Sequence, residues 1–99
     1  MKNKITEKRL RKYFKITSQA IKKVKNSPMD KKRIDAARDF LDMAERYYKD
    51  AKYYHEKEDW VTSFAALNYA HGWLDAGARI RLFKVNDSRL FTVDEESTN

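Results

Sequence analysis

The sequence is poor in the residues that cross-link, bend or interrupt a chain. It has no cysteine, which excludes disulfides, thiolate metal sites and cysteine nucleophiles. Only two glycines and one proline indicate long elements with few tight turns. No apolar run of about 18 residues occurs, so no membrane-spanning segment is expected. The basic N-terminus lacks the apolar stretch of a signal peptide, and we therefore expect a cytoplasmic protein.

The composition is that of one domain built from amphipathic helices. Of the 99 residues, 41% are hydrophobic and 37% are charged, which suits packed helices and one modest core. The periodicity predicts helices over about residues 5–25, 28–57 and 59–83. Because short loops make consecutive helices antiparallel, we predict an all-α, up-down-up three-helix bundle over residues 1–85. Residues 86–99 are expected to form a partly extended tail that packs on the bundle and frays at its end.

Basic residues gather at the start of the chain. The first 33 residues hold 13 lysines and arginines against 2 acidic residues, a net +11, whereas the other 66 hold 9 against 13, a net −4. Over residues 5–25 the apolar side chains recur at helical spacing, and basic ones fall on the opposite side. This candidate anion-binding face consists of Lys4, Lys8, Arg11, Lys15 and Lys22. Such a face indicates either a solvated surface or a site for an anionic partner.

Residues 26–30 mark the clearest boundary between helices. Pro28 suits the first position of a helix, Ser27 can cap that helix, and Asp30 follows at the spacing of a capping box. We therefore predict that the second helix begins at Pro28, with one wide apolar face and one face of mixed charge. Tyr53 falls among the charged residues, which predicts an exposed ring.

The segment 59–83 is apolar on almost every side, more than one helix of a small domain normally is. Asp59 can cap it, and a face that includes Trp60 and Leu67 is expected to fill the core. The second face is a candidate interface formed by Tyr69, Trp73 and Ile80, padded by Ala65, Ala66, Ala76 and Gly77. Because so small a chain hardly covers both faces, we expect the second to meet the LFTV segment (90–93) or a second copy.

Two glycines lie inside this third expected helix. Each costs about 1 kcal/mol relative to alanine in a helix interior. Gly72 and Gly77 therefore make sense where another part of a protein approaches the helix closely.

A narrow polar seam, formed by Asn68, His71, Asp75 and Arg79, separates the two faces. His71 and Asp75 stand four residues apart, a spacing at which a carboxylate can orient an imidazole as a general base. Asp75 and Arg79 have the same spacing, which equally suits an ordinary ion pair. Nothing in the sequence supplies a nucleophile or a second base, so we predict a core histidine, no catalytic residues and no enzyme.

The sequence gives weaker evidence for binding of metals, cofactors or nucleic acids. The two histidines fall on different helices, and the clustered Asp35, Asp39 and Asp42 stand beside arginines, so we expect neither a metal site nor a cofactor. The tyrosines could stack on bases while the basic face follows phosphates, although no nucleic-acid-binding motif is present. A domain that binds RNA or DNA therefore stays open as an alternative. The first helix is too poor in bulky apolar residues for a membrane surface.

Two stretches resemble known families. Residues 51–70 follow the spacing of a single tetratricopeptide hairpin, with Glu58 where that motif prefers glycine, but a solenoid needs about three copies. The stronger resemblance rests on AARDFLDMAERYYKDAKYY (36–54), EKEDWVTSFAALNYAHGWLDAGARIRLF (56–83) and LFTVD (90–94), and above all on YAHGWLDAGAR. These residues are similar to the DUF357 family. The resemblance implies an archaeal source and a compact three-helix fold, and it brings no established activity.

These patterns favour a non-enzymatic module for protein interaction or self-association. The excess of apolar surface on the third helix predicts a protein partner or a homodimer. The alternative is an accessory domain that binds RNA or DNA through the basic face of the first helix.

Overall fold

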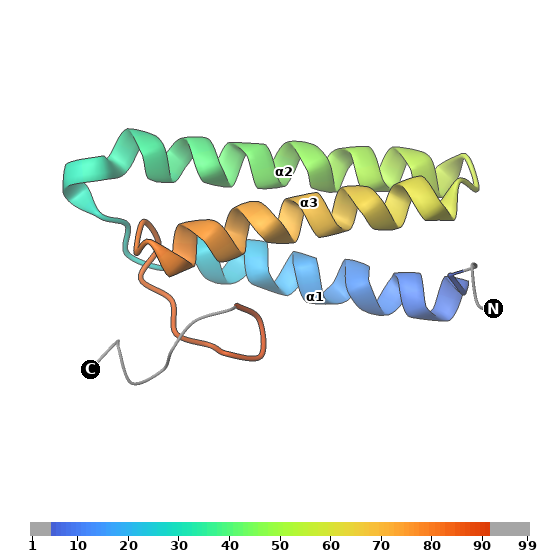
Figure 1. Cartoon of the computed structure of the whole chain (residues 1–99), viewed down its shortest axis with the longest axis horizontal. Coiled ribbons are helices and arrows are strands. Elements are labelled where there is room, and N and C mark those ends of the chain that lie inside the picture. The colour runs from blue at the N-terminus through green and yellow to red at the C-terminus, as the bar shows by residue number, and fades with distance from the viewer. Residues whose placement is uncertain (1–4, 92–99) are drawn as a thin grey trace.

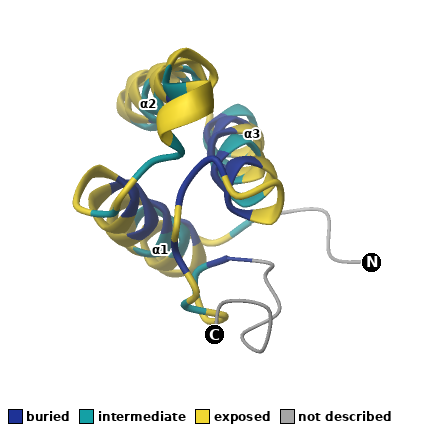
Figure 2. Cartoon of the chain, turned by 90° about the vertical axis from the view of Figure 1, so that its left-hand side faces the viewer, coloured by how far each residue is buried: buried dark blue, intermediate teal, exposed yellow. Residues whose placement is uncertain are grey.

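The computed structural model describes residues 5–91 and confirms the all-α three-helix bundle (Figure 1). Helices α1 (Glu7–Lys25), α2 (Ile34–Glu56) and α3 (Trp60–Arg79) run up, down and up. Viewed from the end in Figure 2, they occupy the corners of a triangle. α2 and α3 form the most extensive pair, and α1 packs mainly against α3. α3 is the central helix, with seven buried residues against five in α1 and three in α2.

The first helix forms as its sequence pattern predicts. Thr6 caps it, since its side-chain oxygen accepts a hydrogen bond from the backbone N–H of Arg9 at 3.1 Å. The buried side of α1 is the predicted apolar stripe, here represented by Leu10, Thr17, Ala20, Ile21 and Val24. The opposite side of α1 is exposed (Figure 2), so the helix separates its core residues from its basic residues.

The start of the second helix differs from the prediction. The segment at Pro28 is extended, and α2 begins at Ile34 after a short 3₁₀ turn (η1, Lys31–Arg33). Ser27 does not cap α2: its hydroxyl donates to the carbonyl of Val24 at 2.8 Å and closes α1 instead. The cap of η1 is Asp30, which accepts from the backbone N–H of Lys32 at 3.0 Å. The prediction failed because residues 28–30 are held by a distant segment.

That distant segment is the chain just after α3. Met29 and Phe83 form an antiparallel β-bridge. The backbone N–H of Asp30 donates to the carbonyl of Leu82, and that of Lys84 donates to the carbonyl of Pro28, each at 3.0 Å. In a helix that started at Pro28 the N–H of Asp30 would have no acceptor within the helix, whereas here both this N–H and the Pro28 carbonyl are hydrogen-bonded. The loop before α2 and the segment after α3 are therefore hydrogen-bonded to each other at one end of the bundle.

A tight turn joins α2 to α3, and a buried hydroxyl helps to pair them. Glu58 has φ 61°, the left-handed conformation that glycine adopts most easily. Asp59 then caps α3 as predicted, accepting from the N–H of Thr62 at 3.1 Å. Inside the hairpin, the fully buried Ser63 donates through its hydroxyl to the carbonyl of Ala51 at 2.7 Å. This bond lets a polar side chain sit where the two helices approach closely.

The third helix ends at Arg79, four residues before the predicted end at Phe83. Arg81 has φ 62°, and its N–H donates to the carbonyl of Ala78 at 3.1 Å. The N–H of Leu82 donates to the carbonyl of Gly77 at 2.8 Å. This pair of bonds is a Schellman motif, which stops a helix and turns the chain. Its usual left-handed glycine is an arginine here, which explains why the sequence pattern did not reveal the end.

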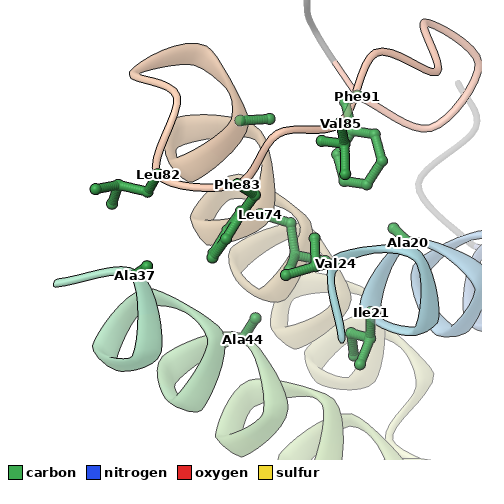
Figure 3. Close-up of a cluster of buried hydrophobic side chains, with 11 residues drawn as sticks. Ala20, Ile21, Val24, Ala37, Ala44, Leu74, Leu82, Phe83, Val85 and Phe91 are labelled. Carbon is green, nitrogen blue, oxygen red and sulfur yellow. The ribbon is translucent and has the colours of Figure 1, made fainter. Parts of the chain in front are cut away.

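After the Schellman motif at the end of α3, the side chains of Leu82 and Phe83 lie in the core. Both are about 1% exposed, and they pack with Leu74 and with residues of all three helices. In Figure 3 Leu74 points toward Val24 of α1, the Phe83 ring points toward the side of α2, and Val85 and Phe91 overlap at the edge of the cluster. A second cluster, built on Leu10, Ala51, Ala66 and Leu67, fills the other end of the bundle. The segment after α3 is thus a structural part of the core.

Candidate functional site

One side of α3 is apolar and exposed along its whole length. Its large side chains are open to solvent: Val61 is 64% exposed, Tyr69 62% and Ile80 49%. Between them lie exposed small residues. We call this surface the α3 outer face and define it by Val61, Ala65, Tyr69, Gly72, Ala76 and Ile80. Exposed apolar side chains that gather on one side of a helix make this surface a candidate interface.

The α3 outer face borders a groove between α2 and α3. The groove has a volume of about 540 Å³ and is lined by Phe40, Asn68, Tyr69, Gly72, Trp73 and Ala76. Aromatic contacts shape its α2 side. The rings of Phe40 and Trp73 meet edge to face at 4.9 Å between centroids, and Tyr47 stacks on Tyr69 at 5.2 Å. These contacts fix the large rings in place, so the groove is formed before anything enters it.

The two glycines of α3 have different environments. A Cβ placed on Gly77 would lie 2.2 Å from Cε2 of Phe83, so this glycine makes room for the buried ring. A Cβ placed on Gly72 would have no atom within 4 Å. Since Gly72 costs about 1 kcal/mol of helix stability, the packing of the described chain does not account for it. A close approach by something outside this chain would.

The residues of the predicted interface lie in different surroundings. Tyr69, Ile80 and Ala65 lie on the exposed surface, and Trp73 is half-buried at its edge. Two predicted padding residues do not belong there: Ala66 is 8% exposed within a core cluster, and Gly77 lies under Phe83. Sequence reasoning missed Val61 and Gly72. Their place could have been found from the spacing 61, 65, 69, 72, 76 and 80, which advances by four, four, three, four and four residues.

The C-terminal segment does not cover the α3 outer face. As far as residue 91 it lies against the other side of α3, where Phe91 is 3% exposed in the core cluster and Leu90 packs beside it. The expectation that LFTV folds onto Tyr69, Trp73 and Ile80 is therefore wrong for Leu90 and Phe91. Thr92 and Val93 lie outside the described residues. The physical reason is a polar anchor at His71 together with the apolar surface of α1.

His71 is that anchor. Its Nε2 is hydrogen-bonded to the carbonyl oxygen of Leu90, and its ring stacks on Phe91 at 6.5 Å between centroids. The same Nε2 lies 3.8 Å from Oδ1 of Asp75, so the structure brings these two seam residues together. The same ring nitrogen therefore faces both the Leu90 carbonyl and the Asp75 carboxylate. This arrangement suits attachment of the C-terminal segment.

The other seam residues have separate surroundings. Asn68 is exposed and lines the groove beside Tyr69. Arg79 is exposed in the last turn of α3. The seam therefore divides into His71, which binds the C-terminal segment and has Asp75 beside it, and the two exposed residues Asn68 and Arg79.

The basic face of α1 is exposed as its pattern predicts. Lys8, Arg11, Lys15 and Lys22 are all exposed, and none pairs with an acidic side chain of residues 5–91. Lys4 lies outside the described residues. The structure adds neighbours that the sequence pattern did not single out. A shallow depression is lined by Lys8, Arg11 and Lys15 together with Thr6, Arg9, Lys12 and Tyr13.

Over the described part of the chain, no three histidine or acidic side chains gather as a metal ion would need. Arg46 bonds Asp42 at 2.8 Å, which places one member of the predicted acidic cluster in an ion pair. Among the described helices, none has the length and apolar character needed to cross a membrane.

Comparison with known proteins identifies a family without a recorded role. The model of the family described as "Protein of unknown function (DUF357)" matches residues 12–83. These residues include most of α1, all of α2 and α3, and the turn that ends at Phe83. No curated protein and no solved structure matches the chain.

Proposed function

Because the chain belongs to the DUF357 family of unknown function, we propose its role from its own surface: it is a non-enzymatic interaction module that docks another protein segment on the α3 outer face. The observation that carries this proposal is the environment of Gly72. A helix-destabilising residue stands in the middle of an exposed apolar surface, where its own chain leaves the space above it empty.

The size of the exposed side chains supports the same role. Val61, Tyr69 and Ile80 are each about half or more exposed, and burial of such a side chain contributes about 1.5–3 kcal/mol. Three of them in one row offer enough apolar surface for association, and Gly72 and Ala76 let a partner backbone approach closely. Tyr69 is suited to an interface because it combines a large ring with a polar tip.

A matched pair of tyrosine variants tests the proposal. Tyr69→Glu places a charge in the α3 outer face, and Tyr53→Glu places the same charge on a tyrosine of α2 that is 54% exposed. We expect Tyr69→Glu to weaken association at least tenfold, because a buried unpaired carboxylate costs more than about 1.4 kcal/mol. Tyr53→Glu should behave as the wild type.

Two readouts are needed, since the partner is either another copy or a different protein. Sedimentation of the purified chain reports self-association. Quantitative mass spectrometry of proteins recovered from host cells with a tagged chain reports other partners. If Tyr69→Glu matches Tyr53→Glu in both readouts, the α3 outer face is not an interaction site and the proposal is overturned.

A second function, binding of an RNA or DNA backbone by α1, is supported by a separate observation. The exposed Lys8, Arg11, Lys15 and Lys22 follow one side of a 19-residue helix, which is about 28 Å long. Within residues 5–91 no carboxylate neutralises them. A row of uncompensated cations on one side of a helix supplies the electrostatic attraction on which binding to a phosphate backbone depends.

Salt dependence tests this second function. Fluorescence anisotropy with labelled single-stranded RNA should show affinity that falls steeply with salt. Lys15→Glu should weaken binding and lower the slope of log K against log salt by about 1. Lys49→Glu is the control, because it reverses one exposed charge on α2, outside the basic face. Equal effects of the two reversals, or binding that salt does not change, would exclude this role.

A further inference from the structure

We propose, as an extension of the proposed function, that the occupant of the α3 outer face is a second copy of this chain, whose α3 runs antiparallel to the first. In this dimer Tyr69 of each copy packs over Gly72 of the other. Three observations support this partner and this orientation: the order of large and small residues on the face, the charges at its two ends, and its dimensions.

The order of residues on the α3 outer face is complementary to its own reverse. Its midpoint lies between Tyr69 and Gly72, and positions equidistant from that midpoint match in an antiparallel pair. Val61 then meets Ile80, Ala65 meets Ala76, and Tyr69 meets Gly72. Large residues at the ends meet each other, small residues meet where the helices come close, and the largest ring meets the residue without a side chain. A twofold axis produces each contact twice.

The spacing of the central residues fits this pairing. Ala65, Tyr69, Gly72 and Ala76 advance by four, three and four residues, the repeat of helices that pack at a crossing angle of about 20°. Tyr69 is 62% exposed in the free chain, and the space above Gly72 is open. The space above Gly72 can therefore receive a side chain of the other copy, and the exposed Tyr69 ring, stacked on Tyr47 of its own chain, stands opposite it in the antiparallel pair.

The ends of α3 carry opposite charges. Acidic residues surround its N-terminal end, where Glu56, Glu58 and Asp59 are all exposed beside Lys57. Basic residues surround its C-terminal end, where Arg79, Arg81 and Lys84 are all exposed. An antiparallel pair places each acidic end beside a basic end and also opposes the two helix dipoles. A parallel pair would place like charges together, so charge selects the antiparallel orientation.

The dimensions of the face fit a second copy that binds weakly. The 20-residue α3 is about 30 Å long, and a helix with its side chains is about 10–12 Å wide. This corresponds to about 300 Å² for each copy and about 600 Å² for the pair, an area typical of weak association. The α3 of a second copy is long enough to cover the whole face, and we expect the dimer to form at high protein concentration.

Disulfide trapping tests both the partner and the direction. The natural chain has no cysteine, so introduced thiols are the sole reactive ones. Ala65→Cys and Ala76→Cys alter two exposed residues. In the antiparallel dimer, residue 65 faces residue 76 of the partner, whereas the two copies of residue 65 are about 17 Å apart along the helix. A disulfide needs Cα atoms within about 7 Å.

The expected result is a disulfide-linked dimer when the two variants are mixed, and none with either variant alone. One variant carries a small tag, so that the mixed dimer has its own position on a non-reducing gel. Mixing Ala65→Cys with Ser18→Cys, an exposed position on α1, controls for random collision. Linkage of each variant with itself and not in the mixture would show parallel packing and overturn the proposal.

Failure of this inference can be told apart from failure of the proposed function. If the chain is monomeric and no disulfide forms, but a different protein is recovered through Tyr69, the second copy is refuted and the interaction module stands. If neither a dimer nor a partner that depends on Tyr69 is found, both are refuted. A mixed disulfide that disappears when Tyr69→Glu is added to both chains supports both.

Discussion

The two glycines of α3 allow one stability experiment to test the structure closely. Gly72 and Gly77 lie in the same helix, five residues apart, and alanine is the same change at both. At Gly72 the new Cβ meets nothing within 4 Å, so the gain in helix propensity, about 1 kcal/mol, should appear in full. For a domain of this size we expect Tm to rise by about 4–8 °C.

At Gly77 the gain in helix propensity is smaller than the cost of a steric clash with Phe83. The Cβ would lie 2.2 Å from Cε2, 2.7 Å from Cδ2 and 2.9 Å from Cζ of Phe83. Phe83 is 1% exposed, and its backbone is held by the β-bridge to Met29, so the ring has little freedom to move. Overpacking this severe costs about 3 kcal/mol. We therefore expect Gly77→Ala to lower the free energy of unfolding by about 2 kcal/mol.

The assay is urea or thermal unfolding at a concentration low enough to keep the chain monomeric. A control variant removes the cause of the clash: in a Phe83→Leu background, Gly77→Ala should cost much less than in the wild type. If Gly72→Ala and Gly77→Ala changed stability equally, or if Phe83→Leu gave no relief, the packing described for Phe83 would be wrong.

Three further substitutions test other parts of the fold. Arg81→Gly should raise the free energy of unfolding by about 0.5–1 kcal/mol in urea unfolding. Glycine removes the strain of the left-handed backbone, about 1–2 kcal/mol, and this exceeds the entropy that glycine adds to the unfolded chain, about 0.4–1 kcal/mol. A loss of stability would contradict φ 62° at this residue. Ser63→Ala should cost about 1 kcal/mol through loss of the buried hydrogen bond to Ala51, and an unchanged urea midpoint would count against that bond. Hydrogen bonds from the Arg33 side chain and then from the Lys32 backbone lower the pKa of Asp30 below its ordinary 3.8. A carboxylate with a lowered folded-state pKa stabilises the fold above its unfolded pKa, and this contribution disappears as pH falls through the folded value. Asp30→Asn should therefore make Tm fall less steeply below about pH 4, and identical Tm profiles would refute the link.

The two proposed functions use opposite parts of the molecule. The α3 outer face lies on the solvent side of α3, whereas the basic face lies on the side of α1 turned away from its buried residues. A dimer formed through α3 would leave the basic face of both copies open. Tyr69→Glu and Lys15→Glu should consequently act on separate readouts, with no effect of either on the other.

Much of the fold could be predicted because helix formation is read from local pattern. The apolar spacing of α1, the Asp59 cap and the exposed Tyr53 each depend on residues within a turn or two of one another. The surplus of apolar residues on α3 also predicted a second apolar face, although the tail that was one expected cover of it lies elsewhere as far as residue 91. Even the turn at Glu58 had a local signal, since the residue stands where a similar hairpin prefers glycine and adopts φ 61°.

Other features were decided by contacts between residues far apart in the chain. Pro28 and Asp30 carry the local signature of a helix start, yet backbone bonds to Leu82 and Lys84 hold them extended. The sequence by itself determined that α3 has two apolar faces and two interior glycines. Only the tertiary structure decided that Phe83 packs on Gly77 and that the tail binds at His71, which leaves the space over Gly72 open. The reason is that helical periodicity specifies which residues share a face, while long-range packing specifies which face is covered.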